Sequence, residues 1–199
     1  MYWNVHGTPP KVAEGSTKLD GAGFAAPMVL PGTYTVKLKI KDKDYVSTVR
    51  CVNDESNKDY TPEDRRLVYE KAMALQLLYN KVNNSIDSIN YYQKLLTADT
   101  IAYSKNKNAK VFYDELQKIK AELMATKKVS IFADEKRIRE SVSELYSTFC
   151  WMEVKPSGSQ LEAIDDLQKD FDKQSAELIK VMAKHLPKHP KLREKKKVD

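Results

Sequence analysis

Few residues of this 199-residue chain have the types and spacing that chemistry requires, and the histidines come first. Of the three histidines, His185 and His189 lie four positions apart, a spacing that on a helix can bring two imidazoles to one metal ion. Pro187 stands between them and breaks a helix, and no third ligand is near in the sequence. We therefore expect His185 and His189 in a solvated tail rather than a metal site, and His6 at a surface or interface.

Carboxylate pairs and nucleophiles are equally scarce. Asp165 and Asp166 are adjacent, but neighbouring residues on a helix point about 100° apart, so they cannot share one proton, and a solvated helix face is expected. The glycine-containing segment 21–24 lacks the Lys-Ser/Thr of a phosphate loop, and no serine sits in a Gly-x-Ser-x-Gly elbow. The sequence therefore predicts no catalytic residue, no metal ligand and no cofactor.

The two cysteines are expected to be buried free thiols. Cys51 falls in an expected strand, and Cys150 falls in an expected helix beside Phe149 and Trp151. Nothing in the sequence brings the two sulfur atoms together, so a disulfide is the less favoured alternative.

The net charge of +6 is concentrated at the C-terminal end. Residues 184–199 carry seven basic and two acidic side chains, a net charge of +5, whereas the remainder is almost balanced at +1. This tail has no aromatic residue for base stacking, which argues against nucleic acid as a partner. We expect at most weak, salt-sensitive contact with polyanions. The candidate contact residues are Lys188, Lys191, Arg193, Lys195, Lys196 and Lys197.

Aromatic side chains are the other candidates for a functional surface, because the chain has eleven tyrosines. A tyrosine buries an apolar ring while keeping a polar tip, which suits an interface. For the tyrosines on helices, packing within this chain is the favoured alternative. The candidate interface residues are Tyr2, Trp3, Phe24, Tyr69, Tyr91 and Tyr92.

The element that must organise these residues is a long helix over 61–96. Apolar residues recur at alternating steps of four and three, which predicts one buried stripe on a helix about 50 Å long. Thr61 can cap its first turn, and Pro62 fits the first helical position. The stripe consists of Val68, Ala72, Leu75, Tyr79, Val82, Ile86, Ile89, Gln93 and Leu96.

The same spacing predicts three further helices. Residues 97–108, before the second, are left open as loop or further helix. The third is expected after an N-cap at Asp134, and the fourth after residues 155–158 with a capping box of Ser159 and Glu162. Prolines beyond residue 186 end the fourth. Their stripes are Phe112, Leu116, Ile119 and Leu123; Ile138, Val142, Leu145, Phe149 and Met152; and Ile164, Leu167, Phe171, Leu178 and Val181.

The N-terminal quarter predicts β structure. Residues 2–5 are expected to form a short strand, followed over residues 7–32 by a connection that is unusually long for a compact domain. Alternating residues over 34–40, and a return strand over 45–52, predict a hairpin with one buried face. A lone hairpin is marginal in water, so it needs the first strand, the helices or strands from elsewhere. The face comprises Tyr34, Val36, Leu38, Ile40, Tyr45, Val49 and Cys51.

The expected fold class is α+β. A partial, antiparallel Ig-like β segment with its long loop occupies 1–53, an antiparallel bundle of about four helices occupies 61–186, and a basic, disordered tail occupies 187–199. No apolar run of about 18 residues exists, so no transmembrane segment is expected. The first seven residues have neither a basic nor an apolar region, so they are not expected to act as a signal peptide.

Four segments carry a resemblance to a known family. They are Tyr-Trp-Asn-Val at 2–5, Ala-Pro-Met-Val-Leu-Pro-Gly-Thr-Tyr-Thr-Val-Lys-Leu at 26–38, Thr-Pro-Glu-Asp at 61–64 and Lys-Pro-Ser-Gly-Ser-Gln-Leu at 155–161. Their order resembles the C-terminal part of exported bacterial β-propeller proteins of the sialidase-like or sortilin-like type. Those proteins carry BNR (Asp-box) repeats and are often labelled glycosyl hydrolases. The resemblance extends from residue 2 to about residue 186.

The resemblance implies the non-catalytic end of a longer, exported protein found in the periplasm or at the cell surface. It implies an Ig-like β segment and a helical bundle downstream of propeller blades, with an upstream β-propeller domain or a second chain as partner. The chain has no Asp-box, so no catalytic residue is carried over. It starts at the Tyr-Trp strand, and we expect it to be a fragment or the product of a split reading frame.

Three functions follow as hypotheses. The favoured one is a non-catalytic accessory module that acts in structural packing or protein interaction, including self-association as a homo-oligomer. A second is a binding module for an anionic polymer or carbohydrate, using the loop over 7–32, the lysine face of the hairpin and the tail. A third is a hydrolase-associated domain that contributes to a glycosidase-type active site in the full-length protein.

Overall fold

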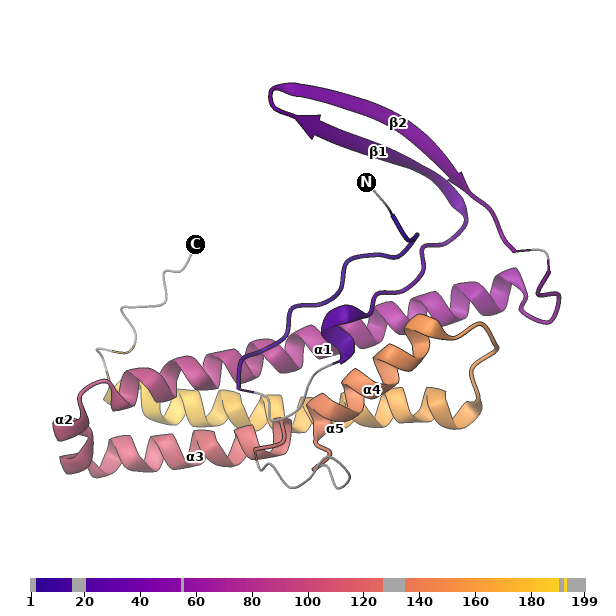
Figure 1. Ribbon diagram of the computed structural model, residues 1–199. Helices are drawn as coiled ribbons and strands as arrows, with labels where there is room; N and C mark the ends of the chain where they lie inside the picture. Colours follow the sequence, from indigo (N-terminus) through magenta and orange to yellow (C-terminus); the bar gives the residue numbers. More distant parts are fainter. Residues whose placement is uncertain (1–2, 16–20, 55, 127–134, 190–191, 193–199) are drawn as a thin grey trace.

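The computed structural model describes residues 3–15, 21–54, 56–126, 135–189 and 192. Figure 1 shows an elongated stack of helices from which a two-stranded hairpin rises. The prediction of a small antiparallel sheet followed by helices is confirmed. The elements in chain order are the 3₁₀ turn η1 (Gly21–Phe24), β1 (Gly32–Ile40), β2 (Lys43–Cys51), α1 (Pro62–Thr97), α2 (Thr100–Lys105), α3 (Lys107–Leu123), α4 (Ile138–Trp151), α5 (Gly158–His185) and the 3₁₀ turn η2 (Leu186–Lys188).

Helix α1 has 36 residues and begins where the sequence predicts. The Asp64 backbone N–H donates to Thr61 Oγ1 at 3.1 Å, and the Thr61 backbone N–H donates to the Asp64 carboxylate at 3.3 Å. This reciprocal pair satisfies two donors that a bare helix end would leave exposed. Every residue of the predicted stripe is buried, so the register is confirmed. Leu78, Asn83 and Tyr92 widen the buried surface beyond the stripe.

The starts of the later helices differ from the predictions. The segment 97–108 holds α2 and the start of α3. Helix α4 begins at Ile138 with Arg137 as its N-cap, so a start after Asp134 is wrong; Asp134 itself lies outside the described residues. Helix α5 is capped by Ser157, whose hydroxyl accepts from the Gln160 N–H at 3.3 Å. Ser157 and Gln160 form the same reciprocal pair two residues before Ser159, and this starts the helix earlier.

The stripes of these helices form the core with α1. Helices α3 and α4 follow one another along α1, while α5 runs beside both, as Figure 1 shows. At each level the core therefore lies between α1, α5 and either α3 or α4. The stripe residues of α3 are all buried, and those of α4 and α5 are buried or pack against the buried core.

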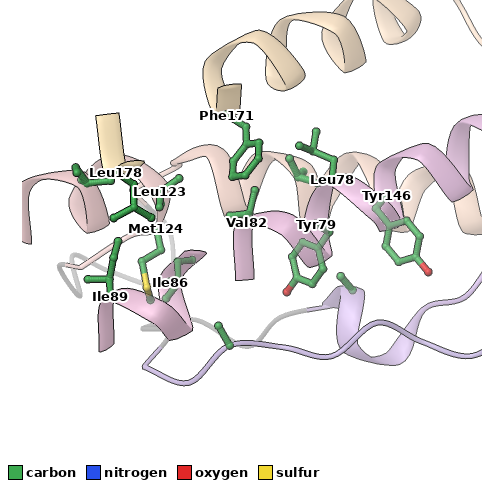
Figure 2. Close-up of a cluster of buried hydrophobic side chains, with 14 of the residues drawn as sticks. Leu78, Tyr79, Val82, Ile86, Ile89, Leu123, Met124, Tyr146, Phe171 and Leu178 are labelled. Carbon is green, nitrogen blue, oxygen red and sulfur yellow. The ribbon is translucent and has the colours of Figure 1, made fainter. Parts of the chain in front are cut away.

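Figure 2 shows the centre of this core. Val82, Ile86 and Ile89 of α1 lie among Leu123 and Met124 at the end of α3 and Phe171 and Leu178 of α5, each no more than 8% exposed. Burying one such side chain stabilises the folded state by about 1.5–3 kcal/mol relative to leaving it in water. The long stack is therefore held together by apolar contacts along its length.

The N-terminal segment packs against the helices through small residues. Ala13, Ala22 and Ala25 are at most 4% exposed and belong to the helical core. The Tyr146 hydroxyl of α4 donates to the Ala25 carbonyl at 3.0 Å. A Cβ at Gly23 would lie 2.7 Å from a methyl of Val12, so a larger residue at this approach would force Val12 to shift. The long connection thus forms part of the packed structure.

The strand expected over residues 2–5 is not formed by the residues described there. Val5 has a φ of 57°, a left-handed conformation that interrupts a strand and is rare for a β-branched residue. Beyond it, an isolated bridge joins His6 to Met28, and the Gly7 N–H donates to the Pro27 carbonyl at 3.0 Å. The chain therefore pairs once with its own returning segment, away from the hairpin's ladder.

Candidate interaction surface

The hairpin presents an apolar face whose composition follows from its register. Strands β1 and β2 pair antiparallel from Gly32 with Cys51 to Ile40 with Lys43, and residues 41–42 form the connecting turn. Residues paired across an antiparallel ladder share a face, so the alternating apolar residues of both strands gather on one side. We call this the apolar face of the hairpin: Tyr34, Val36, Leu38, Ile40, Tyr45, Val49 and Cys51.

The prediction that this face is buried is wrong for the described chain. Exposed fractions are 40% for Val36, 37% for Leu38, 51% for Ile40, 53% for Tyr45 and 38% for Val49. Figure 1 shows why: the hairpin arches away from the helices instead of lying on them. The alternation correctly indicates which side chains share a face, but no described element covers that face.

The end of the hairpin nearest the helices is held by contacts of Tyr34 with residues outside the two strands. The Tyr34 hydroxyl donates to the Leu30 carbonyl at 2.5 Å, and the Trp3 ring meets the Tyr34 ring edge-on at 5.6 Å between centroids. Burial raises the pKa of Tyr34, with smaller contributions from Cys51 and from Tyr69 of α1. Val29, which precedes β1, and Tyr69 of α1 line one cleft, so the segment that leads into the hairpin lies beside the second turn of α1.

Residues 7–15, here called the strap, run beside α1 without helix or strand structure of their own (Figure 1). Three side-chain amides of α1 donate to strap carbonyls: Gln76 to Thr8 at 2.8 Å, Asn83 to Lys11 at 3.2 Å and Asn90 to Glu14 at 3.3 Å. The amides are seven residues apart, about 10.5 Å along a helix. The carbonyls are three residues apart, about 9–10 Å in an extended chain. The spacing of the amides matches the spacing of the carbonyls, so one face of α1 binds the strap backbone at regular intervals.

Asn83 is the buried centre of this arrangement, at 3% exposure. Its Oδ1 accepts from the Ala13 N–H at 3.3 Å and from Arg139 Nε of α4 at 3.1 Å. Arg139 is 1% exposed and its guanidinium lies 3.5 Å from the Glu140 carboxylate. One amide therefore joins the strap, α1 and α4, and it gives a buried cation a hydrogen-bond acceptor.

A cleft of about 620 Å³ lies where the strap and the returning segment at Pro27 and Val29 meet α1. Its helical wall follows one face of α1, at steps of three and four apart from the adjacent Asn83 and Asn84. That wall consists of Tyr69, Met73, Gln76, Asn80, Asn83, Asn84 and Asp87. The cleft thus combines an apolar end at Tyr69 and Met73 with amide and carboxylate groups further along the helix.

The aromatic candidates from the sequence occupy different environments. Trp3 is 40% exposed, Phe24 is 75% exposed, and Tyr69 is half-buried at the cleft. Tyr92 is 5% exposed and packs on Phe112 at 6.4 Å, so it belongs to the core. Tyr91 is half-buried and meets Tyr92 edge-on. Tyr2 lies outside the described residues. Among the described candidates, Trp3 contacts Tyr34 of β1, and Tyr69 lines the cleft beside the segment that leads into β1.

Among the basic candidates, Lys188 is exposed on η2. The other five, Lys191, Arg193, Lys195, Lys196 and Lys197, lie outside the described residues. Asp165 and Asp166 are exposed on α5, as expected, and Asp166 pairs with Lys169 at 2.9 Å.

His185 is not in a solvated tail, and that prediction is wrong. Its ring is 3% exposed, stacks on Phe112 of α3 at 4.8 Å, and its Nε2 lies 2.9 Å from the Glu115 carboxylate. The reason is that α5 continues to His185, so its last turn still faces α3. Lys184 and then His185 lower the pKa of Glu115. His189 is half-buried, and burial lowers its pKa.

The cysteines are free thiols, as expected. The predicted burial is confirmed for Cys150 in α4 but is wrong for Cys51, which is half-buried at the end of β2. Burial raises the pKa of Cys150 to about 11, which suppresses its thiolate form at neutral pH.

No other chemical centre emerges from the part of the chain that the structure describes. Within it, no three His, Cys, Asp or Glu side chains are grouped so that they could hold a metal ion. Its helices include none with the length and apolarity needed to cross a bilayer. The amide row of α1 is the feature that sequence reasoning missed. Amides at positions 76, 83 and 90 share the heptad spacing of the apolar stripe, and that was the available signal.

No family model matches this chain, and neither a curated protein nor a solved structure matches it.

Proposed function

We propose that this chain is a non-catalytic accessory module whose hairpin packs against a β-sheet partner. The observation that carries the proposal is the apolar face of the hairpin, which is ordered by its ladder and exposed along both arms. Isolated two-stranded hairpins are marginal in water, and exposed apolar patches on one face are typical of interaction sites. A covering sheet would bury this face and could pair with the open edges of β1 and β2.

The charges of the hairpin leave its apolar face suited to an apolar partner surface. The hairpin has five basic side chains, at 37, 39, 41, 43 and 50, against Asp42 and Asp44, a net charge of +3. The register places Lys37, Lys39 and Arg50 on the opposite face, and Lys43, paired with Ile40, on the apolar face. A partner surface that is apolar at its centre and carries an acidic group opposite Lys43 complements this face.

The resemblance to exported β-propeller proteins supplies the context of the proposal. In that context the hairpin completes an Ig-like β segment with strands from an upstream domain or a second chain, and the helices form the rigid support. Support comes from the alternation of β1 and β2 and from the open side of their sheet.

The first test asks whether the apolar face stabilises the isolated chain or is available to bind a partner. Replacing Val36 and Leu38 together by Thr keeps strand propensity but removes apolar surface. If the face serves a partner, the melting temperature of the isolated chain stays within about 1–2 °C of the wild type. As a matched control, Val142→Thr, at a fully buried position, should lower it clearly. A large fall in the melting temperature of the hairpin variant would mean that the chain itself buries the face.

The second test looks for the partner. Benzoylphenylalanine placed at Leu38, on the apolar face, should cross-link on illumination in expressing cells to a polypeptide with a β-sheet domain. The same probe at Ile179, 66% exposed on α5, is the control and should not give that product. The product should vanish when Val36 and Val49 are replaced by Thr. A product that contains only this chain, or no product at position 38, would overturn the proposal.

A further inference from the structure

The cleft beside the strap is a second surface, separate from the hairpin face, and the way α1 holds the strap indicates its ligand. Gln76, Asn83 and Asn90 bind the strap backbone through their amides. The cleft lies next to these contacts, because Gln76 and Asn83 also line its wall. The strap thus already occupies the part of this polar helix face that is formed by Gln76, Asn83 and Asn90.

A neighbouring row of polar side chains on the same helix lines the cleft without a hydrogen bond to the strap. Asn80, Asn84 and Asp87 line the cleft, and their side chains make no hydrogen bond or ion pair with another residue in the described part of the chain. They follow one another at steps of four and three, so they face the same side of α1. Asn84 is exposed, while Asn80 and Asp87 are half-buried, and their polar groups are therefore available to a ligand.

The opposite wall excludes one common way of binding a peptide. Pro9 and Pro10 of the strap line the cleft and have no backbone N–H, so the strap cannot serve there as the edge of a β-ladder. A chain lying in the cleft must be held instead by side-chain amides, as the strap itself is. Each amide offers both donors and an acceptor to a peptide group.

We propose that this cleft binds an extended polypeptide segment, which Asn80 and Asn84 recognise through its backbone. From Tyr69 to Asp87 the helix wall is about 27 Å long, which accommodates about eight extended residues. The half-buried Tyr69 and the Met73 side chain provide an apolar contact for a side chain at one end. A sugar is a weaker fit, because of the described lining residues Tyr69 alone offers an aromatic ring for stacking.

The test uses the full chain and a phage-displayed library of random twelve-residue peptides. Enriched peptides, synthesised and titrated, should bind with micromolar dissociation constants and shift the side-chain NH₂ signals of Asn80 and Asn84 in ¹⁵N spectra. The double variant Asn80→Asp/Asn84→Asp preserves shape and removes the amide donors, and it should weaken binding at least tenfold. Asn108→Ala, at an exposed asparagine of α3, is the matched control and should leave binding unchanged.

Two further measurements separate backbone recognition from other binding. Replacing single peptide bonds of the selected peptide by esters weakens the carbonyl acceptors and should reduce affinity at particular positions. The Val36→Thr/Leu38→Thr variant should bind the peptide normally, so that failure of the hairpin proposal leaves this one intact. No enrichment, binding that is insensitive to the double variant, or a glycan-array hit that shifts the same two signals would overturn the proposal.

Discussion

At the scale of single residues, Asn83 joins three parts of the molecule with one side chain. Its amide bonds to the strap, while its oxygen accepts from the buried Arg139. Buried polar groups of this kind are costly when a partner is removed, because the group left behind stays desolvated.

Replacing Asn83 by Ala should therefore destabilise the protein by about 1–3 kcal/mol. Urea unfolding followed by circular dichroism measures this loss. The neighbouring Asn84→Ala, at an exposed position whose side chain bonds to no other described residue, should change the free energy of unfolding by less than about 0.5 kcal/mol. Equal stabilities for the two variants would show that the Asn83 contacts contribute nothing.

The two thiols should differ in reactivity. Burial raises the pKa of Cys150 to about 11, so at pH 8 almost none of it is thiolate, and the side chain is also shielded from reagents. Cys51 is half-buried at the end of β2. A colorimetric thiol reagent at pH 8 should modify Cys51 within minutes and Cys150 only on unfolding. Rapid modification of both in the native protein would contradict this assignment.

At the scale of elements, the stripe of α1 is the principal determinant of stability. Leu75 and Ile86 are fully buried, so truncating either leaves a cavity between helices. Leu75→Ala and Ile86→Ala should each cost about 2–5 kcal/mol. Leu77 lies on the same helix but is 57% exposed, and Leu77→Ala should cost less than about 0.5 kcal/mol. Melting close to that of the wild type for all three variants would show that the register of α1 is wrong.

The contact between α3 and α5 should weaken in acid. Lys184 and His185 lower the pKa of Glu115, so its ionised form is stabilised in the folded state. The contribution is fully present above the unfolded carboxyl pKa, about 4.3, and is lost as pH falls through the lower folded value. The stability difference between wild type and Glu115→Gln should thus be constant from about pH 6 upwards and shrink below about pH 4. A difference that does not change with pH would exclude this ion pair as its source.

At the scale of the whole molecule, much of the helical stack follows from sequence periodicity. The stripe of α1 and those of the later helices are predicted because each is a local property of spacing. The capping residue of α5 was misplaced because Ser157 and Ser159 head equivalent patterns two residues apart. His185 was misplaced because the position of a helix's last turn depends on tertiary contact, here with Phe112.

The hairpin shows what periodicity cannot predict. Alternation identifies which side chains share a face, and the ladder confirms that part. Whether the face is covered depends on elements distant in sequence or on another molecule, and spacing carries no information about them. The cleft was missed for a related reason: Asn80, Asn84 and Asp87 are ordinary helix-surface residues until the strap places a second wall beside them.

The path of the strap also affects the order in which the parts of the protein can fold. Its bonds to α1 join residues separated by 68, 72 and 76 positions in the sequence. During translation, at about 5–20 residues per second, the strap emerges several seconds before the helix that binds it. It cannot complete its contacts until Asn90 has left the ribosome, and its two prolines disfavour helix in the meantime. Docking of this segment is therefore a late step of folding.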